Sequence, residues 1–234
     1  MKKQSFKVIA FDADDTLWIN EPYYQETETE FCKLLLPYMD AESVSKELYS
    51  TEMLNIPLYG YGAKGFMLSL IETALRVTNH SIDPKDLSKI ISLGKELLNK
   101  PIVLLDGVNE VLEKLSRQNQ KMIVATKGDL LDQERKLQKS KLENYFHHVE
   151  IMSEKNEKGY LNLIAHLDIQ PEEFLMIGNS LRSDIMPVLN IGGYAIHVPY
   201  HTTWEHEKNA SVEKNGDNFV EVTELTELIK LLGF

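Results

Sequence analysis

Short hydrophobic runs separated by amphipathic stretches make up most of this chain. Residues 5–11 form an apolar run that ends abruptly in acidic residues, a pattern typical of a buried central strand in a parallel sheet. Three further runs cover residues 121–125, 174–177 and 194–198, and a weaker candidate covers 147–152. We expect these segments to form the strands of one sheet.

Between the runs, hydrophobic residues recur at the spacing of one helix face. The sets are Val108, Val111, Leu112 and Leu115, then Leu161, Ile164 and Leu167, and finally Val222, Leu225, Leu228, Ile229 and Leu232. Strands that alternate with helices predict βαβ units, and therefore an α/β fold with a mostly parallel sheet.

Residues 21–100 interrupt this alternation. They contain no convincing strand, and their prolines fit helix starts or breaks. A helix face is evident at Phe66, Leu70, Ile71, Ala74 and Leu75, and the prolines are Pro22, Pro57 and Pro84. We interpret the segment as a helical insert after the first strand, which leaves residues 1–20 and 101–234 as a discontinuous core.

Charge and cysteine content narrow the choice of partners. The 234 residues carry a formal net charge of -11, which argues against binding nucleic acid or an anionic membrane through bulk electrostatics. An anionic substrate would need local positive groups, such as a metal ion, a lysine or backbone amides. Cys32 is the only cysteine, so no internal disulfide can form and we expect a cytoplasmic protein. A monomer and a homodimer both fit the sequence.

Acidic residues cluster where the first strand ends, and ligands bind beyond the carboxyl ends of strands in open α/β sheets. Asp12, Asp14 and Asp15 fall within four residues. Alternation along an extended chain would point Asp12 and Asp14 to the same side, where the two carboxylates repel unless a cation lies between them. Mg²⁺ with oxygen ligands is the simplest solution. A lone Asp here would instead suggest an Asx turn that caps a helix.

The residues at four strand ends together resemble the motifs of the haloacid dehalogenase-like hydrolase superfamily. The first motif is a strand ending in Asp-x-Asp-x-Thr/Val, the second a Thr or Ser ending a strand, the third a lysine, and the fourth Gly-Asp-x-x-x-x-Asp. The matches are Asp12, Asp14 and Thr16, then Thr126, then Lys155, and then Gly178, Asn179 and Asp184. The resemblance covers nearly the whole chain. It implies a Rossmann-like three-layer α/β/α core with an all-helical cap at residues 21–100.

The resemblance also implies catalytic roles. Asp12 would be the nucleophile that takes up a phosphoryl group, and Asp14 would protonate the leaving oxygen and then activate water. Thr126 would donate its hydroxyl to a phosphoryl oxygen, and backbone amides at Lys127 and Gly128 would add donors.

The lysine of the third motif has two candidates, Lys155 and Lys158. Lys155 is preferred because it lies nearer the preceding strand and Tyr160 follows it at the family's usual spacing. For Lys158, the favoured interpretation is a surface lysine at a helix start.

Two positions depart from the family pattern. Asn179 stands where the family usually has a metal-ligating Asp, so Mg²⁺ affinity would be lower and Asp184 would carry more of the load. The predicted metal ligands are therefore Asp12, Asp14, Asn179 and Asp184. Asp15 stands where many members have Gly, and we expect a turn or capping function for it.

Two other patterns carry weaker hypotheses. Residues 60–65 fit the Gly-x-Gly-x-x-Gly pattern of dinucleotide-binding loops. No strand precedes them, so we do not expect a cofactor site there. As part of a cap, this loop would offer Lys64 to the substrate. His197, His201 and His206 cluster after the last strand without a defensible zinc spacing, and we interpret them as surface or rim residues.

The sequence thus predicts a Mg²⁺-dependent phosphatase that hydrolyses small phosphorylated metabolites through an aspartyl-phosphate. The alternatives are a phosphomutase, a 2-haloacid dehalogenase, a phospho-receiver, or an inactive phospho-binding homologue suggested by Asn179. Dehalogenases of this family lack the second acid, so the presence of Asp14 favours phosphoryl transfer.

Overall fold

The computed structural model describes residues 5–207 and 217–233, and these residues form two compact units. Within the described residues, the first unit takes in the chain up to Glu21, Ile102–Lys127 and the residues from Lys136 onward. The second unit comprises Pro22–Pro101 and Gly128–Arg135. No described helix is both long enough and apolar enough to cross a bilayer.

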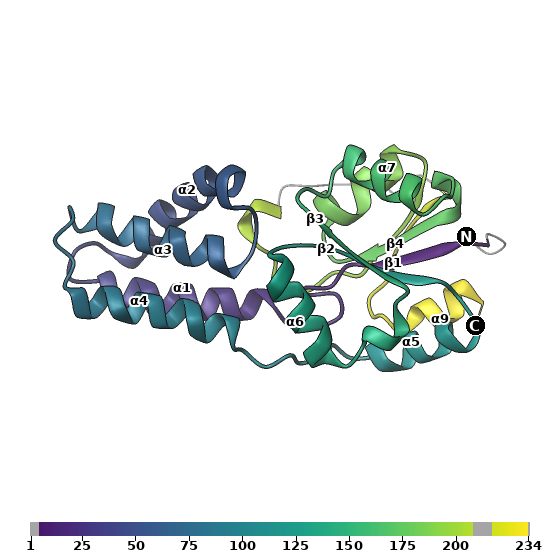
Figure 1. Ribbon diagram of the computed structural model, residues 1–234, viewed down its shortest axis with the longest axis horizontal. Helices are drawn as coiled ribbons and strands as arrows, with labels where there is room; N and C mark the ends of the chain where they lie inside the picture. Colours follow the sequence, from purple (N-terminus) through teal and green to yellow (C-terminus); the bar gives the residue numbers. More distant parts are fainter. Residues whose placement is uncertain (1–4, 208–216, 234) are drawn as a thin grey trace. The chain divides into compact units, whose positions relative to one another are not determined.

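A parallel six-stranded sheet forms the centre of the first unit, in the order β3-β2-β1-β4-β5-β6 (Figure 1). The strands are β1 (Val8–Phe11), β2 (Met122–Lys127), β3 (His148–Met152), β4 (Phe174–Gly178), β5 (Tyr194–His197) and β6 (Phe219–Glu221). The predicted α/β fold with a parallel sheet is confirmed. Among the described strands, β6 alone was not predicted from the sequence.

Strand β1 lies at the point where the strand order reverses. It pairs with β2 on one side and with β4 on the other, so that Phe11 lies opposite both Val124 and Ile177. From β1 the sheet extends through β2 and β3 on one side and through β4, β5 and β6 on the other. Such a switch point opens a crevice at the carboxyl ends of the strands, and Asp12 follows β1 at this point.

Helices cover both faces of the sheet (Figure 1). One face packs against α5 (Val108–Arg117) and α9 (Glu227–Leu232), and the other packs against α7 (Glu157–His166) and α8 (Met186–Asn190). The residues of β1 alternate between the two cores, with Ile9 and Phe11 in one and Val8 and Ala10 in the other. This arrangement is the expected three-layer core. The helix predicted over residues 222–232 begins later than expected, at Glu227.

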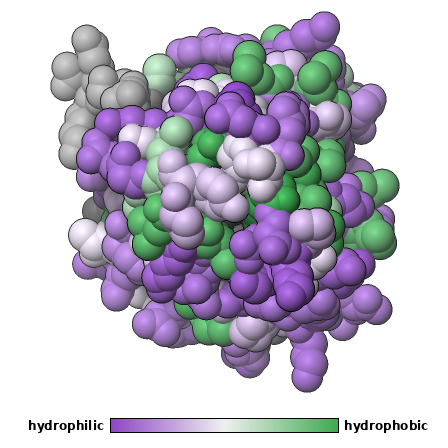
Figure 2. All heavy atoms as spheres, turned by 90° about the vertical axis from the view of Figure 1, so that its left-hand side faces the viewer, coloured by the Kyte–Doolittle hydropathy of each residue, from purple (hydrophilic) through white to green (hydrophobic). Residues whose placement is uncertain are grey.

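The second unit is mainly helical. It contains α1 (Glu21–Leu35) from Pro22 onward, α2 (Ala41–Tyr59), α3 (Ala63–Val77), α4 (Pro84–Leu98) and the first half of α6 (Leu130–Ser140). Its core includes the predicted face of α3 through Phe66, Leu70 and Ala74. The surface of this unit seen in Figure 2 is mostly hydrophilic with smaller hydrophobic areas.

Candidate active site

Asp12 lies immediately after the central strand of the sheet. Its backbone N–H donates to the carbonyl of Ile177 at 2.9 Å, which extends the pairing of β1 with β4 by one residue. The side chain is buried. A carboxylate held this deep needs a charged or hydrogen-bonding partner.

Lys155 is that partner. Its Nζ lies 2.5 Å from Asp12 Oδ1 and 2.6 Å from Asp184 Oδ1, and its side chain is only 2% exposed. Lys155 directly precedes Asn156, whose side chain caps α7 by accepting from the Gly159 N–H at 2.9 Å. Lys158 lies in the exposed first turn of that helix. The structure therefore brings Lys155, and not Lys158, to Asp12, while its catalytic role stays a prediction.

The charges of this buried group do not balance. One ammonium faces the carboxylates of Asp12 and Asp184, so the fully ionised triad carries one excess negative charge. Burial raises the pKa of Asp12 to about 7, the Lys155 ammonium opposes this rise, and the Asp184 carboxylate adds to it. Burial would lower the pKa of Lys155, but Asp12 and Asp184 hold it well above its ordinary value. The triad would accept a further cation.

A helical turn after β4 positions Asp184. The turn spans Leu181–Ile185, and the Ser180 backbone N–H donates to Asp184 Oδ2 at 3.0 Å. A Cβ at Gly178 would collide with the Asp184 carboxylate, so the glycine of the predicted fourth motif gives that carboxylate its space. Both oxygens of Asp184 thus have partners, and its predicted role as a metal ligand stays untested.

The two acids of the first motif have different partners. Asp14 Oδ1 accepts from the Trp18 indole at 2.7 Å, and both Asp14 oxygens lie within 3.1 Å of the Lys136 ammonium. Asp14 thus has Trp18 and Lys136 as hydrogen-bond partners, and its charge adds to the rise in the pKa of Asp12. The predicted role of Asp14 as a metal ligand stays a prediction.

The second motif lies at the carboxyl end of β2. Thr126 is buried two residues beyond Val124, which pairs with Phe11 of β1, and its hydroxyl donates to the Lys127 carbonyl at 3.2 Å. The Lys127 ammonium lies 2.9 Å from both Ser183 Oγ and Glu207 Oε1.

This ion pair perturbs Glu207. Burial would raise the pKa of Glu207, but Lys127 and the hydroxyls of Ser180 and Ser183 hold it at about 2. Gly128 follows with φ 133°, and a Cβ there would meet the Gln133 side chain.

Residues 6–192 match the family described as haloacid dehalogenase-like hydrolase. The chain belongs to this family. A solved haloacid dehalogenase-like hydrolase from Xanthomonas campestris is 34% identical, has a TM-score of 0.87, and covers 100% of this chain and 93% of its own. The predicted Rossmann-like fold is therefore confirmed.

Two curated relatives are phosphatases. N-acylneuraminate-9-phosphatase of Mus musculus is 29% identical over 127 residues, which cover 52% of this chain and 51% of that protein. Glyceraldehyde 3-phosphate phosphatase of Pyrococcus furiosus is 25% identical over 134 residues, covering 54% and 53%. The chain thus matches about half the length of each curated relative.

The same fold also supports dehalogenation. A 2-haloacid dehalogenase from Pseudomonas syringae has a TM-score of 0.65 at 16% identity and covers 97% of this chain and 98% of its own. Identity at this level shows the shared fold alone, and the reaction of this haloacid dehalogenase-like hydrolase depends on its site residues and not on its fold.

Oxygen atoms beside Asp12 fit the divalent cation implied by the family. Thr16 Oγ1 lies 3.0 Å from Asp12 Oδ2 and 3.2 Å from Asn179 Oδ1, and it accepts the Asn179 N–H at 3.1 Å. A hydroxyl has one hydrogen, so only one of the two oxygens can accept it at a time. Together with the excess negative charge of the triad, this surplus of hard oxygen acceptors fits Mg²⁺. The described residues hold no group of three or more His, Cys, Asp or Glu placed for a metal ion. The predicted metal ligands Asp12, Asp14, Asn179 and Asp184 stay predictions, and of these Asp12 and Asn179 offer oxygens beside Thr16.

The prediction that His197 is a surface or rim residue was wrong. Instead of lying on the rim, it is buried at the end of β5 between two acceptors. Its Nε2 lies 3.0 Å from the Asn179 carbonyl oxygen, and its Nδ1 lies 3.0 Å from Glu221 Oε2. The ring therefore links the fourth motif of this haloacid dehalogenase-like hydrolase to β6. The sequence held no clear signal for this contact, because β6 was not predicted.

Asp15 has the turn and capping function that the sequence predicted. It adopts a positive φ of 62°, and its carboxylate accepts the backbone N–H groups of Asn20 at 2.8 Å and of Glu21 at 2.9 Å. Burial raises its pKa to about 8, against the lowering effect of these two amides. Asp15 thus anchors the start of α1, as a capping carboxylate does.

The glycine-rich loop at residues 60–65 is a helix–helix connection. Gly60 caps the end of α2 and Gly62 precedes α3, so no strand leads into it, as the sequence predicted. Lys64 pairs with Asp129 at 2.8 Å within the second unit. Its predicted contact with substrate stays a prediction.

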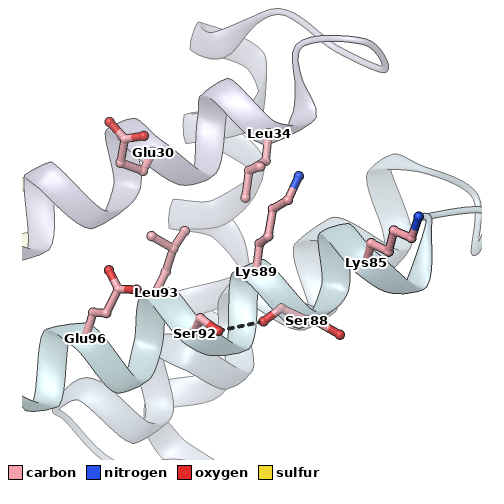
Figure 3. Close-up of a pocket in the computed structure, with 8 residues that line it drawn as sticks. All are labelled: Glu30, Leu34, Lys85, Ser88, Lys89, Ser92, Leu93 and Glu96. Carbon is pink, nitrogen blue, oxygen red and sulfur yellow. Dashed lines mark hydrogen bonds between the residues drawn. The ribbon is translucent and has the colours of Figure 1, made fainter.

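An open groove of about 370 Å³ lies between α1 and α4 in the second unit (Figure 3). Its lining residues are Glu30, Leu34, Lys85, Ser88, Lys89, Ser92, Leu93 and Glu96. None of them belongs to a predicted motif, and lysines and glutamates of opposite charge share the groove. We assign it no role in the reaction.

Proposed function

We propose that this chain is a Mg²⁺-dependent phosphatase that hydrolyses small phosphomonoesters through an aspartyl-phosphate on Asp12. The observation that carries the proposal is the contact of Lys155 with Asp12 at the carboxyl end of β1, with Asp14 two residues further along the chain. Lys155 offers a positive charge beside the nucleophile, where the oxygens of a transferring phosphoryl group would need it.

In the first half of the reaction, an Asp12 carboxylate oxygen forms a bond to phosphorus while the bond from phosphorus to the leaving oxygen breaks. Asp14 gives its proton to that oxygen, so an alcohol departs and the Asp14 carboxylate remains. Thr126 and the backbone amides of Lys127 and Gly128 would donate hydrogen bonds to the phosphoryl oxygens.

In the second half, the Asp14 carboxylate takes a proton from water as the water oxygen bonds to phosphorus. The bond between phosphorus and Asp12 breaks, which restores the Asp12 carboxylate and releases phosphate. Asp14 ends protonated, ready for the next turnover.

Asp12 and Asn179 would hold the cation, and Asp184 would act by holding Lys155. When bound, Mg²⁺ supplies positive charge that offsets the phosphate oxygens. Asn179 brings an oxygen without a charge, so we expect weaker Mg²⁺ binding than an Asp at this position would allow.

The presence of Asp14 argues against dehalogenation, because that chemistry needs only the first Asp. The similarity to two curated phosphatases also supports phosphoester hydrolysis. A phosphomutase would use the same residues, and it would differ by transferring the phosphoryl group back to a sugar instead of to water. We further propose that the helical unit acts as the substrate-selecting cap, with Lys64 as one of its contacts, and that the protein works on metabolites in the cytoplasm as a monomer or homodimer.

Hydrolysis of p-nitrophenyl phosphate with Mg²⁺ or with EDTA tests the proposal. We expect turnover only with the metal, and we expect Asp12→Asn to lower kcat by at least about 10³-fold, because the nucleophile is lost while the shape is kept. Asp168→Asn makes the same chemical change at an exposed position and should behave as wild type. Near-normal turnover by Asp12→Asn, or equal rates in EDTA, would refute the proposal.

A further inference from the structure

Helix α6 places a lysine against the second acid of the first motif. Lys136 Nζ lies 3.0 Å from Asp14 Oδ1 and 3.1 Å from Asp14 Oδ2. The side chains of Lys136 and Asp14 are 15% and 22% exposed, so the pair is partly shielded from water. Both carboxylate oxygens face one ammonium, which restricts rotation of the carboxylate.

A rigid indole completes the enclosure of Asp14. The Trp18 side chain is buried, and its Nε1–H donates to Asp14 Oδ1 at 2.7 Å. The backbone of this turn is held as well, since the Trp18 carbonyl accepts the Asp15 N–H at 2.8 Å and Trp18 bridges to Leu104. An indole N–H can only donate, so the ring fixes where an Asp14 oxygen must lie.

The Lys136 ammonium is itself oriented by a third group. Asn20 Oδ1 lies 2.8 Å from Lys136 Nζ, and the Asn20 backbone is tied to the Asp15 carboxylate at 2.8 Å. The segment that carries Asp14 therefore also supplies the acceptor that steers the lysine. A simple surface ion pair would lack these two supports.

We propose that Lys136 is a positioning residue, which together with Trp18 holds the Asp14 carboxylate in the orientation needed for proton transfer. This inference rests on the proposed function, because Asp14 is the proposed acid and base. Lys136 itself does not touch the reacting atoms. A misplacement of a catalytic group by about 1 Å costs up to about 10²-fold in rate.

The competing explanation is an ion pair that only stabilises the fold. Partly exposed ion pairs contribute roughly 1 kcal/mol or less, and their loss lowers stability without discriminating among substrates. A positioning role instead predicts a loss that depends on Asp14 and on the leaving group. The value of kcat/KM covers only the steps up to departure of the alcohol, so it isolates the step in which Asp14 donates its proton.

The test compares Lys136→Met, Lys136→Arg and the matched control Lys139→Met, which changes an exposed lysine on the same helix. With glycerol phosphate, whose alkoxide needs a proton to leave, Lys136→Met should lower kcat/KM about 10-fold. With p-nitrophenyl phosphate, which leaves readily without protonation, the loss should be less than about 3-fold. Lys136→Arg should recover part of the loss, and Lys139→Met should match wild type.

A double-mutant cycle decides between the explanations. If Lys136 acts through Asp14, adding Lys136→Met to Asp14→Asn should change kcat/KM by less than about 2-fold. Equal losses on both substrates, or a full additional loss in the Asp14→Asn background, would overturn the positioning role. If wild type turns over substrate, Asp12→Asn does not, and Lys136→Met behaves like Lys139→Met, then the positioning role is refuted while the proposed function stands. If wild type shows no turnover at all, both the proposed function and the positioning role are refuted.

Discussion

Removal of the Lys155 charge should show how strongly the two buried carboxylates depend on it. Lys155→Met keeps an unbranched side chain of similar length but leaves Asp12 and Asp184 facing each other without a counter-charge. Breaking a buried pair by deleting one partner costs roughly 3–5 kcal/mol. With the Lys155 side chain 2% exposed, solvent screening gives little relief, and we expect a loss in that range at pH 8 in EDTA.

The loss should depend on pH in a defined direction. Without Lys155, burial and the Asp184 carboxylate raise the folded-state pKa of Asp12 further above its value in the unfolded chain. A group of this kind contributes stability at low pH that is lost as pH rises through its folded pKa. The difference between wild type and Lys155→Met should therefore be smaller at pH 5 than at pH 8.

Urea unfolding followed by tryptophan fluorescence measures this difference. Trp18 and Trp204 are the two tryptophans and both belong to the first unit, so the signal reports the unit that contains the triad. Lys158→Met changes an exposed lysine three residues away and should cost less than about 0.5 kcal/mol. Adding Asp184→Asn to Lys155→Met should restore part of the lost stability. A Lys155→Met protein as stable as Lys158→Met at pH 8 would refute the reasoning.

Two further variants test other contacts of the site. Gly178→Ala should push the Asp184 carboxylate out of its place, lowering the free energy of unfolding by about 1–3 kcal/mol together with turnover; a fully active, equally stable variant would contradict the close approach. Glu207 has a folded pKa of about 2, so its ion pair with Lys127 contributes stability above pH 4.5 that is lost as pH falls toward 2. The gap in urea midpoint between wild type and Glu207→Gln should accordingly be larger at pH 6 than at pH 3, and a constant gap would show that the charge is unimportant.

The strands that carry the motifs could be predicted because they are buried on both faces and therefore consist of continuous apolar runs. Every residue of β1 and of β4 is buried, so both segments are visible as hydrophobic stretches that stop at a polar residue. The edge strand β6 has only three residues and is partly exposed. Too little apolar surface is buried there to leave a readable pattern.

Helix α6 shows why the partner of Asp14 could not be predicted. Its first turn exposes Leu130 and Leu131 while burying Asp132 and Gln133, the reverse of the usual amphipathic arrangement. A search for apolar periodicity therefore passes over the helix that carries Lys136. Lys155 could be predicted without apolar periodicity, because its spacing from the preceding strand and from Tyr160 resembles the family motif.

The position of β1 between the two halves of the sheet has a consequence for biosynthesis. Asp12 contacts Lys155, 143 residues later in the chain, and its neighbour Thr16 contacts Asn179, 163 residues later. Such distant pairings close slowly, because the loop entropy is lost before the contacts form. During synthesis β1 therefore waits for β2 on one side and, longer still, for β4 on the other, and a product truncated before β4 would leave that second edge of β1 unpaired.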